Sequence, residues 1–294
     1  MICGTRGSPL ALAQTRQVLE ALNMDVEIEV IRTSGDIYRG QFGKDGATKG
    51  LFTKEIDRAL ERGDIDFAVH SLKDVQVDYQ FHIVVPKRGP HCDMLVTRHR
   101  SLDDLPEKAT VGTGSPRRKT ELMRLRHDLE IVPLRGNIGT RIDKASELDA
   151  VVVAAAGVER LGLMGAGGYN FTTLPAPAFM PAPCQGTLGI ACRRSDIETR
   201  KVIERLRDAE TTVCTLAEQE VMRAIGGNCH IPAGAWATVH GDTIRVFASI
   251  NDPGTGVSYR DYAQGPVGRA RDIAHNLADW LLEQGADKIV RSFQ

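Results

Sequence analysis

Two stretches of the sequence share one pattern: Gly4-Thr5-Arg6-Gly7-Ser8-Pro9 and, in the middle of the chain, Gly112-Thr113-Gly114-Ser115-Pro116. In each, a serine can cap a helix and the proline suits the first helical position. A short apolar segment precedes each stretch, and a helix pattern follows it. Each stretch therefore predicts a strand, a turn and a helix, and the repetition predicts two α/β lobes of one design.

The segments around each stretch support this division. The first half is typical of β-α-β-α-β order, with a half-buried strand at 26–30, a helix that ends at Gly63 and a buried strand at 65–69. The middle of the chain repeats this order, with a helix from Ser115 to about His127, a strand at 129–134, a helix near 138–146 and an apolar strand at 150–155.

The last third of the chain follows a different pattern. The proline-rich run at 174–183 cannot form regular structure, and we interpret it as a crossing between the lobes. After it come a helix pattern at about 196–209, two alternating strands at 235–239 and 243–250, and a helix that ends at Gly285. These segments predict a third, smaller α+β lobe.

Composition excludes several classes of protein. The chain has 294 residues, 42% of them hydrophobic and 26% charged, which is typical of a globular protein and not of a disordered one. Its net charge of −1 argues against a nucleic-acid partner, and its longest apolar run, 150–158, is too short to cross a membrane. No secretory signal is expected at the N-terminus, and the six cysteines show neither CxxC pairs nor zinc-finger spacing, so no metal site is predicted.

Both Ser-Pro turns bring arginine to a helix N-terminus, where backbone N–H groups and the helix dipole favour an anion. Arg6 lies on the first turn, Arg117 and Arg118 open the second helix, and Arg135 and Arg141 flank a Gly-Asn-Ile-Gly-Thr turn. Arginine binds carboxylates and phosphates through paired hydrogen bonds. Because ligands of open α/β sheets collect at strand ends, we predict an anion site lined by these arginines.

Two further residues stand where chemistry could use them. Asp74 follows the strand at 65–69 beside Lys73, where it could stabilise a cation or form an ordinary surface ion pair. Cys229 lies in a glycine-rich bend beside His230, where it could be a reactive thiolate or a small buried apolar residue. The residues alone leave both alternatives open.

Over nearly its whole length the chain resembles the porphobilinogen deaminase family, also called hydroxymethylbilane synthases. The matching segments are short one by one, but they follow one another in order with family-like spacing. They are Gly4 to Ala11, Lys49 to Phe52, Ala68 to Asp74, Ser115 to Arg118, Leu134 to Arg141, Ala156 to Gly162, Gln185-Gly186 and Cys229.

The resemblance implies a fold of two hinged α/β lobes, like those of periplasmic binding proteins, plus a small C-terminal α+β domain. The corresponding domains are residues 1–88 with 187–205, residues 92–182, and residues 210–294, the last of which carries the cofactor cysteine. The implied protein is a cytoplasmic monomer without a nucleic-acid or membrane partner.

The resemblance also implies a transferase of porphyrin and heme biosynthesis. Such an enzyme joins four porphobilinogen molecules head to tail with release of ammonia, and then frees the linear tetrapyrrole hydroxymethylbilane. The implied cofactor is a dipyrromethane primer, held by a thioether at Cys229, and the implied catalytic carboxylate is Asp74. The other implied cofactor-binding residues are Lys73, Ser71, Thr113, Ser115, Arg117 and Arg118. The implied binding residues for substrate and growing chain are Arg6, Ser8, Arg135, Arg141, Arg160, Gln185, Phe52 and Lys49.

Five positions depart from the family pattern. Asn228 stands in place of a glycine, Gly114 of a serine, Gln76 of a proline and Ala47-Thr48 of a glycine pair. These changes bear on affinity and loop movement more than on chemistry. Two other functions remain open: a two-lobed anion-binding protein, which needs neither Cys229 nor Asp74, and a deaminase-like paralogue without turnover.

Overall fold

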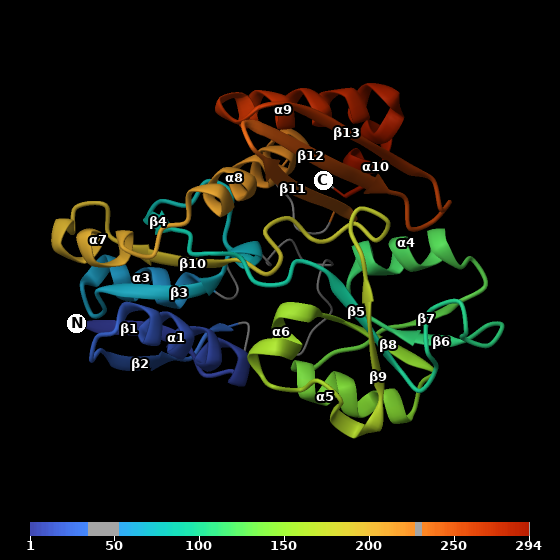
Figure 1. Ribbon diagram of the computed structural model, residues 1–294, viewed down its shortest axis with the longest axis horizontal. Coiled ribbons are helices and arrows are strands. Elements are labelled where there is room, and N and C mark those ends of the chain that lie inside the picture. Colours follow the sequence, from blue (N-terminus) through green and yellow to red (C-terminus); the bar gives the residue numbers. More distant parts are fainter. Residues whose placement is uncertain (35–52, 227–230, 294) are drawn as a thin grey trace. The chain divides into compact units, whose positions relative to one another are not determined.

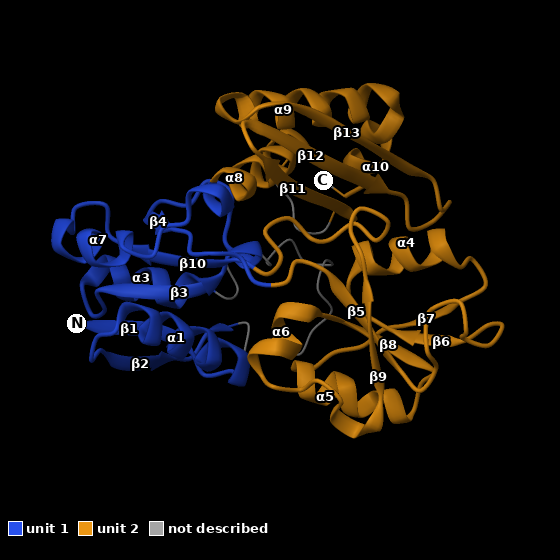
Figure 2. Ribbon diagram, in the orientation of Figure 1, with its two compact units in different colours: residues 1–89, 187–212 blue, residues 90–186, 213–294 orange. Residues whose placement is uncertain are grey.

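The computed structural model describes residues 1–34, 53–226 and 231–293 (Figure 1). The chain forms two compact units (Figure 2). Unit 1 comprises residues 1–89 and 187–212, and unit 2 comprises residues 90–186 and 213–294.

Unit 1 is built on a five-stranded sheet with the order β2-β1-β3-β10-β4. Its strands are β1 (Ile2–Arg6), β2 (Glu27–Ile31), β3 (Phe67–Ser71), β4 (His82–Val84) and β10 (Leu188–Cys192). Strands β1, β2 and β3 are parallel, whereas β10 runs antiparallel to both of its neighbours. The first five described elements follow the predicted β-α-β-α-β order. Strand β10 comes from much later in the chain, within the 187–205 segment that the family resemblance implied for this lobe, but the sequence pattern did not predict it as a strand.

Helices cover both faces of this sheet. They are α1 (Pro9–Leu22), α3 (Lys54–Arg62) and α7 (Ile197–Glu204), and a short 3-10 turn, η1 (Leu72–Asp74), follows β3. Helices α1 and α7 pack on one face, and α3 packs on the other. Helix α3 ends at Gly63, which is left-handed with a φ of 79°, as the sequence predicts. The expected half-buried strand at 26–30 is β2 at the sheet edge, where Val30 is 48% exposed.

The first part of unit 2 is a second five-stranded sheet, with the order β7-β6-β8-β5-β9. Its strands are β5 (Asp93–Thr97), β6 (Thr110–Gly112), β7 (Glu130–Val132), β8 (Ala150–Ala154) and β9 (Asn170–Leu174). Helix α4 (Pro116–Leu125) packs on one face, and α5 (Ile138–Asp143) and α6 (Ala155–Arg160) pack on the other. Along β8, Val152 faces α4 while Val151 and Val153 face α5 and α6. This alternation explains why β8 is apolar throughout. Two 3-10 turns complete this part, η2 (Lys144–Ser146) and η3 (Ala166–Gly168).

The second part of unit 2 is a three-stranded antiparallel sheet that consists of β11 (Ala233–His240), β12 (Thr243–Asn251) and β13 (Ser258–Pro266). Residues of α8 (Ala209–Ala224), α9 (Ala270–Leu281) and α10 (Asp287–Arg291) share one apolar core with this sheet. Between α9 and α10, Gly285 has a φ of 115° and interrupts the helix. The turn η4 (Val267–Arg269) precedes α9.

The structure corrects one expected helix and confirms the fold class. The helix expected at about 196–209 ends at Glu204, and a separate helix, α8, begins at Ala209. Two sheets with helices on both faces and a small α+β part match the predicted class. The proposed three-domain boundaries stay a prediction. Within the described ranges, every helix is too short or too polar to span a lipid bilayer.

Candidate functional site

The predicted residues of unit 1 lie at one edge of its sheet. Strands β1 and β3 are parallel neighbours, with Cys3 opposite Phe67 and Gly4 opposite Ala68. Their carboxyl ends therefore meet at the same edge, the place where α/β sheets bind ligands. This edge carries the residues that leave β1, namely Arg6 and Ser8, and those at the end of β3 and in η1, namely Ser71, Lys73 and Asp74.

The side chains at this edge differ in their hydrogen bonds and in their exposure to solvent. Ser8 caps α1, since its Oγ accepts the backbone N–H of Ala11 at 3.2 Å. Gln14 Nε2 donates to Ser71 Oγ at 2.8 Å, which joins the end of β3 to α1. Arg6 and Lys73 are half-buried, whereas Asp74 is exposed. Of this set, Asp74 presents a carboxylate directly to solvent and so to a ligand.

His70 lies buried beneath the same edge, on β3. Burial lowers the pKa of its imidazole from 6.5 to about 4, and the positive charge of Arg6 contributes to this shift. Its Nε2 lies 3.5 Å from the Tyr79 hydroxyl, which donates to Asp57 in α3. His70 is therefore neutral at pH 7 and part of a buried polar network, and Arg6 lies close enough for its field to act there.

The predicted residues of unit 2 gather in the same way. Strand β6 runs parallel to β7 on one side and to β8 on the other, so the three carboxyl ends share an edge. Thr113 and Ser115 follow β6, Arg135 follows β7, Arg141 lies in α5 and Arg160 ends α6.

A local cap starts α4 at this edge. Ser115 Oγ accepts the backbone N–H of Arg118 at 3.4 Å, and Thr113 Oγ1 accepts the N–H of Ser115 at 3.2 Å. Helix α4 thus begins at Pro116, as the capping pattern predicts. Its N-terminus carries Arg117 and Arg118 on consecutive positions.

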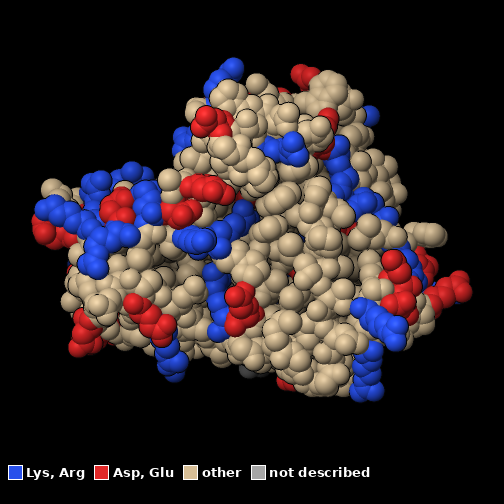
Figure 3. Space-filling model, viewed as in Figure 1, with Lys and Arg blue, Asp and Glu red and all other residues tan. Residues whose placement is uncertain are grey.

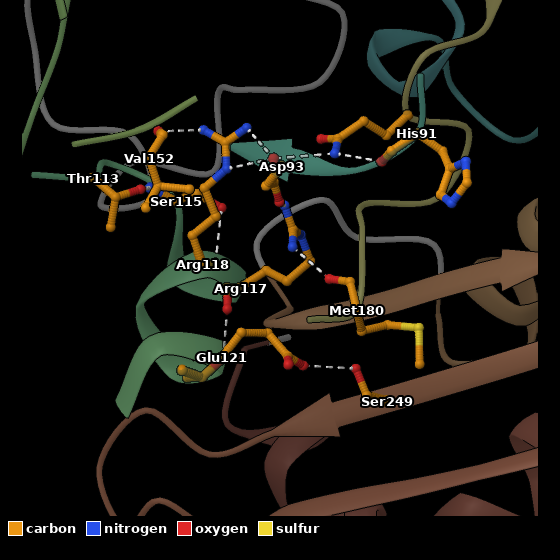
Figure 4. A network of polar contacts seen from close by, with 12 residues as sticks. His91, Asp93, Thr113, Ser115, Arg117, Arg118, Glu121, Val152, Met180 and Ser249 are labelled. Atoms are coloured by element: carbon orange, nitrogen blue, oxygen red, sulfur yellow. Dashed lines mark hydrogen bonds and ion pairs between the residues drawn. The ribbon is translucent and has the colours of Figure 1, made fainter. Parts of the chain in front are cut away.

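Arg117 and Arg118 share one buried carboxylate, that of Asp93 in β5 (Figure 4). Arg117 Nη2 donates to Asp93 Oδ2 at 2.7 Å. Arg118 donates to Oδ1 from Nη2 at 2.7 Å and from Nε at 3.1 Å. Asp93 is 0% exposed and the two arginines are 5% and 6% exposed. These two arginines are therefore not part of a solvated helix face.

Gln185 completes this cluster. Its Nε2 donates to Asp93 Oδ1 at 3.1 Å and to the carbonyl of His91 at 2.8 Å, and its side chain is 1% exposed. Burial alone would raise the pKa of Asp93, but the charges and hydrogen bonds of Arg118 and Arg117 outweigh it and hold that pKa well below its usual range. Asp93 stays ionised, so the cluster holds two positive charges and one negative charge.

Two other arginines in unit 2, Arg141 and Arg160, are partly buried and suit an anionic ligand. Burial lowers the pKa of Arg141 to about 10, and the nearby charge of Arg118 adds to this effect. Burial likewise lowers the pKa of Arg160, whose Nη2 donates to the carbonyl of Gly186 at 2.8 Å. Both stay charged at neutral pH. A bound carboxylate would stabilise these partly desolvated charges, so this edge suits an anion.

Most of the remaining charged residues are spread over the surface. On the face that Figure 3 shows, lysine and arginine side chains are interspersed with aspartate and glutamate side chains, in keeping with a net charge of −1. Arg135 is exposed. Three predicted site residues, Lys49, Phe52 and Cys229, lie outside the described residues, as do Ala47, Thr48 and Asn228.

Comparison with known proteins identifies the family of the chain. Residues 1–201 match the family model "Porphobilinogen deaminase, dipyromethane cofactor binding domain". Residues 212–283 match the model "Porphobilinogen deaminase, C-terminal domain". The chain belongs to the porphobilinogen deaminase family. The resemblance drawn from the sequence is thereby confirmed.

Relatives in this family match almost end to end. Porphobilinogen deaminase of Syntrophus aciditrophicus is 40% identical over 298 residues, which cover 97% of this chain and 96% of the relative. The enzyme of Clostridium novyi is 34% identical over 97% of this chain and 99% of the relative. That of Corynebacterium diphtheriae is 38% identical over 98% of both chains.

Similar solved structures include ligand-binding proteins. The GluR0 ligand-binding core of Nostoc punctiforme matches with a TM-score of 0.39 and 15% identity, over 70% of this chain and 90% of its own. An arginine transport-system periplasmic binding protein of Legionella pneumophila matches with a TM-score of 0.36 and 13% identity, over 69% and 90%. Scores this low add nothing to the family assignment.

The donor set fits the cofactor of this family. A dipyrromethane built from two porphobilinogen units carries several carboxylates. The edge of unit 2 offers guanidinium groups and a capped helix N-terminus, and both favour carboxylates.

Proposed function

We propose that the protein is a hydroxymethylbilane synthase, which joins four porphobilinogen molecules head to tail, releases ammonia at each addition and frees linear hydroxymethylbilane. The observation that carries this proposal is the pair of family models over residues 1–201 and 212–283. The two arginine-bearing sheet edges support it, because each porphobilinogen brings two carboxylates and a growing chain accumulates negative charge.

In unit 2, Arg117 and Arg118 bind carboxylates of the cofactor, together with the turn of Thr113 and Ser115. When bound, the dipyrromethane supplies the primer on which the product is built. Arg135, Arg141 and Arg160 bind carboxylates of substrate and growing chain. The lowered pKa of Arg141 and of Arg160 supports this role, since it reflects positive charge that a ligand anion would stabilise.

In unit 1, Asp74 is the catalytic carboxylate. The aminomethyl group of porphobilinogen is protonated at neutral pH. Its C–N bond breaks with the electron pair on nitrogen, which leaves as neutral ammonia, so the positive charge passes to the pyrrole. An exposed carboxylate fixed on the short turn η1 can stabilise that charge. Arg6 and Ser8 bind substrate carboxylates at the same edge, while Lys73 and Ser71 assist in holding the cofactor.

The remaining assignments rest on the family pattern. Cys229 holds the cofactor through a thioether, and Lys49 and Phe52 contact the substrate. Gln185 contacts the substrate in the same pattern, and the hydrogen bonds that its Nε2 donates to Asp93 and the carbonyl of His91 hold its side chain in place. We also propose a monomeric, cytoplasmic protein.

Intact mass and ammonia release together test the proposal. Protein purified from a host that makes porphobilinogen should carry the mass of two porphobilinogen units less their ammonia, and it should release ammonia from added porphobilinogen. Cys229→Ser should fold and carry no such mass. An unmodified wild-type mass would favour an anion-binding protein, and a modified mass without ammonia release would favour an inactive paralogue. Pyrroles mapped to Cys92 or Cys184 would contradict the assignment of Cys229.

A further inference from the structure

We propose that Asp93 is the positioning residue of the site, which sets the orientation of Arg117 and Arg118 before any ligand arrives. The inference rests on the proposed function, because it concerns how those two arginines receive the cofactor. Asp93 lies at the start of β5 and its carboxylate faces both guanidinium groups (Figure 4). No other residue of the described chain forms an ion pair with either arginine.

The two carboxylate oxygens of Asp93 accept hydrogen bonds from different partners. Oδ2 accepts one bond from Arg117, while Oδ1 accepts two from Arg118 and one from Gln185. The outer ends of the two guanidiniums are held as well, since Arg118 Nη1 donates to the carbonyl of Val152 at 3.1 Å and Arg117 Nη1 donates to that of Met180. Each guanidinium is therefore fixed at two points, one of which is Asp93 in both cases.

Charge and donor counts show what this arrangement leaves for a ligand. Two guanidiniums and one carboxylate have a net charge of +1, which suits one incoming carboxylate. An arginine has five N–H donors, of which the contacts among described residues use three on Arg118 and two on Arg117. Asp93 thus fixes the planes of both groups and leaves donors on each. Such preorganisation strengthens binding by lowering the ordering cost of the site.

A second buried carboxylate, that of Glu121 on α4, provides the matched control. Glu121 is also 0% exposed, and it accepts hydrogen bonds from Ser249, Asn251 and Arg260 of the three-stranded sheet. Within the described ranges its ion pairs join it to Arg124 and Arg260 rather than to the arginine pair at the start of α4. Loss of the charge of Glu121 should therefore lower the stability of the packing of α4 without changing the orientation of Arg117 and Arg118.

The test follows cofactor assembly on the apoprotein. Wild type, Asp93→Asn, Asp93→Glu and Glu121→Gln are made in a host that cannot form porphobilinogen, and porphobilinogen is then added. Intact mass records the rate of cofactor gain as a function of porphobilinogen concentration, and urea denaturation records stability. We expect Asp93→Asn to raise the half-saturating concentration by about 10- to 100-fold, the range for loss of a charge-assisted contact. Glu121→Gln should lose stability yet gain cofactor as wild type does.

Each result decides the inference. A folded Asp93→Asn that gains cofactor like wild type overturns it, and so does a Glu121→Gln that is slowed equally, since the effect would then come from stability. Asp93→Glu keeps the charge but displaces it by one methylene. If Asp93→Asn does not fold, a slowed Asp93→Glu supports the inference and an unchanged one overturns it. A wild-type apoprotein that gains no cofactor contradicts the proposed function instead.

Discussion

Acid should weaken unit 1 through His70, whose pKa is about 4 in the folded chain against its ordinary value of 6.5. The unfolded chain therefore binds a proton more readily than the folded one at any pH between those values. By linkage, the contribution of His70 to the free energy of unfolding is greatest above pH 6.5 and falls as the pH is lowered toward 4. The groups that face His70 are the Arg6 guanidinium, which opposes its protonation, and the Tyr79 hydroxyl, which is held by Asp57.

The size of this effect follows from the two pKa values. At about 1.36 kcal/mol per pKa unit, the gap between 6.5 and about 4 corresponds to about 3 kcal/mol for complete protonation. Between pH 7.5 and pH 5.0 the unfolded imidazole becomes almost fully charged while the folded one stays mostly neutral. That step should cost about 2 kcal/mol of stability.

Urea denaturation followed by circular dichroism at pH 7.5 and pH 5.0 measures this loss. His70→Gln provides the comparison, because glutamine does not titrate and any other acid-sensitive group is common to both proteins. Wild type should lose about 2 kcal/mol more than His70→Gln between the two pH values. Equal losses in the two proteins would refute the account of His70 as a buried neutral imidazole.

The remaining predictions concern the site itself. Asp74→Asn should fold and release ammonia from porphobilinogen at least about a hundredfold more slowly, because it lacks the charge that stabilises the cation; near-normal release would exclude that role. Arg6→Leu, which spares the Asp93 cluster, should still assemble the cofactor but fail to elongate it, and intact-mass analysis that shows no cofactor would contradict this. Gly114→Ala places a Cβ 2.6 Å from the Leu134 carbonyl oxygen and should cost about 1–3 kcal/mol in urea denaturation, whereas Gly139→Ala, with its nearest atom at 3.6 Å, should not.

The sequence predicted those features that depend on nearby residues. The hydroxyl oxygens of Ser8 and Ser115 accept hydrogen bonds from backbone N–H groups three residues later in the chain. A few consecutive residues therefore determine where each helix starts. Gly63 ends α3 for an equally local reason, its left-handed backbone. Because parallel strands bring their carboxyl ends together, the expected sets of residues at both sheet edges also followed from element order.

Features that depend on distant partners escaped prediction. Asp93 gives no local signal, because Arg117 and Arg118 lie 24 and 25 residues away, and Gln185 lies 92 residues away. Helix α8 was missed because its buried positions include the weak helix former Thr215 and the small residue Ala217 in place of large apolar residues.

The sequence pattern also hid β13 at the edge of its sheet. Its exposed stretch Asp261-Tyr262 and the polar Gln264 break the alternation that marks a half-buried strand. The strand is recognisable only through its pairing with β12.

The position of β10 in its sheet determines when unit 1 can complete its fold during synthesis. Strands β3 and β4 are complete once Val84 has been made, yet β10, which lies between them, begins only at Leu188. At about 5–20 residues per second, the nascent chain waits several seconds or more before β10 can pair with the facing edges of β3 and β4. During synthesis those edges are targets for chaperones or for other nascent chains. A chain truncated after Gly89, which lacks β10, should therefore be insoluble.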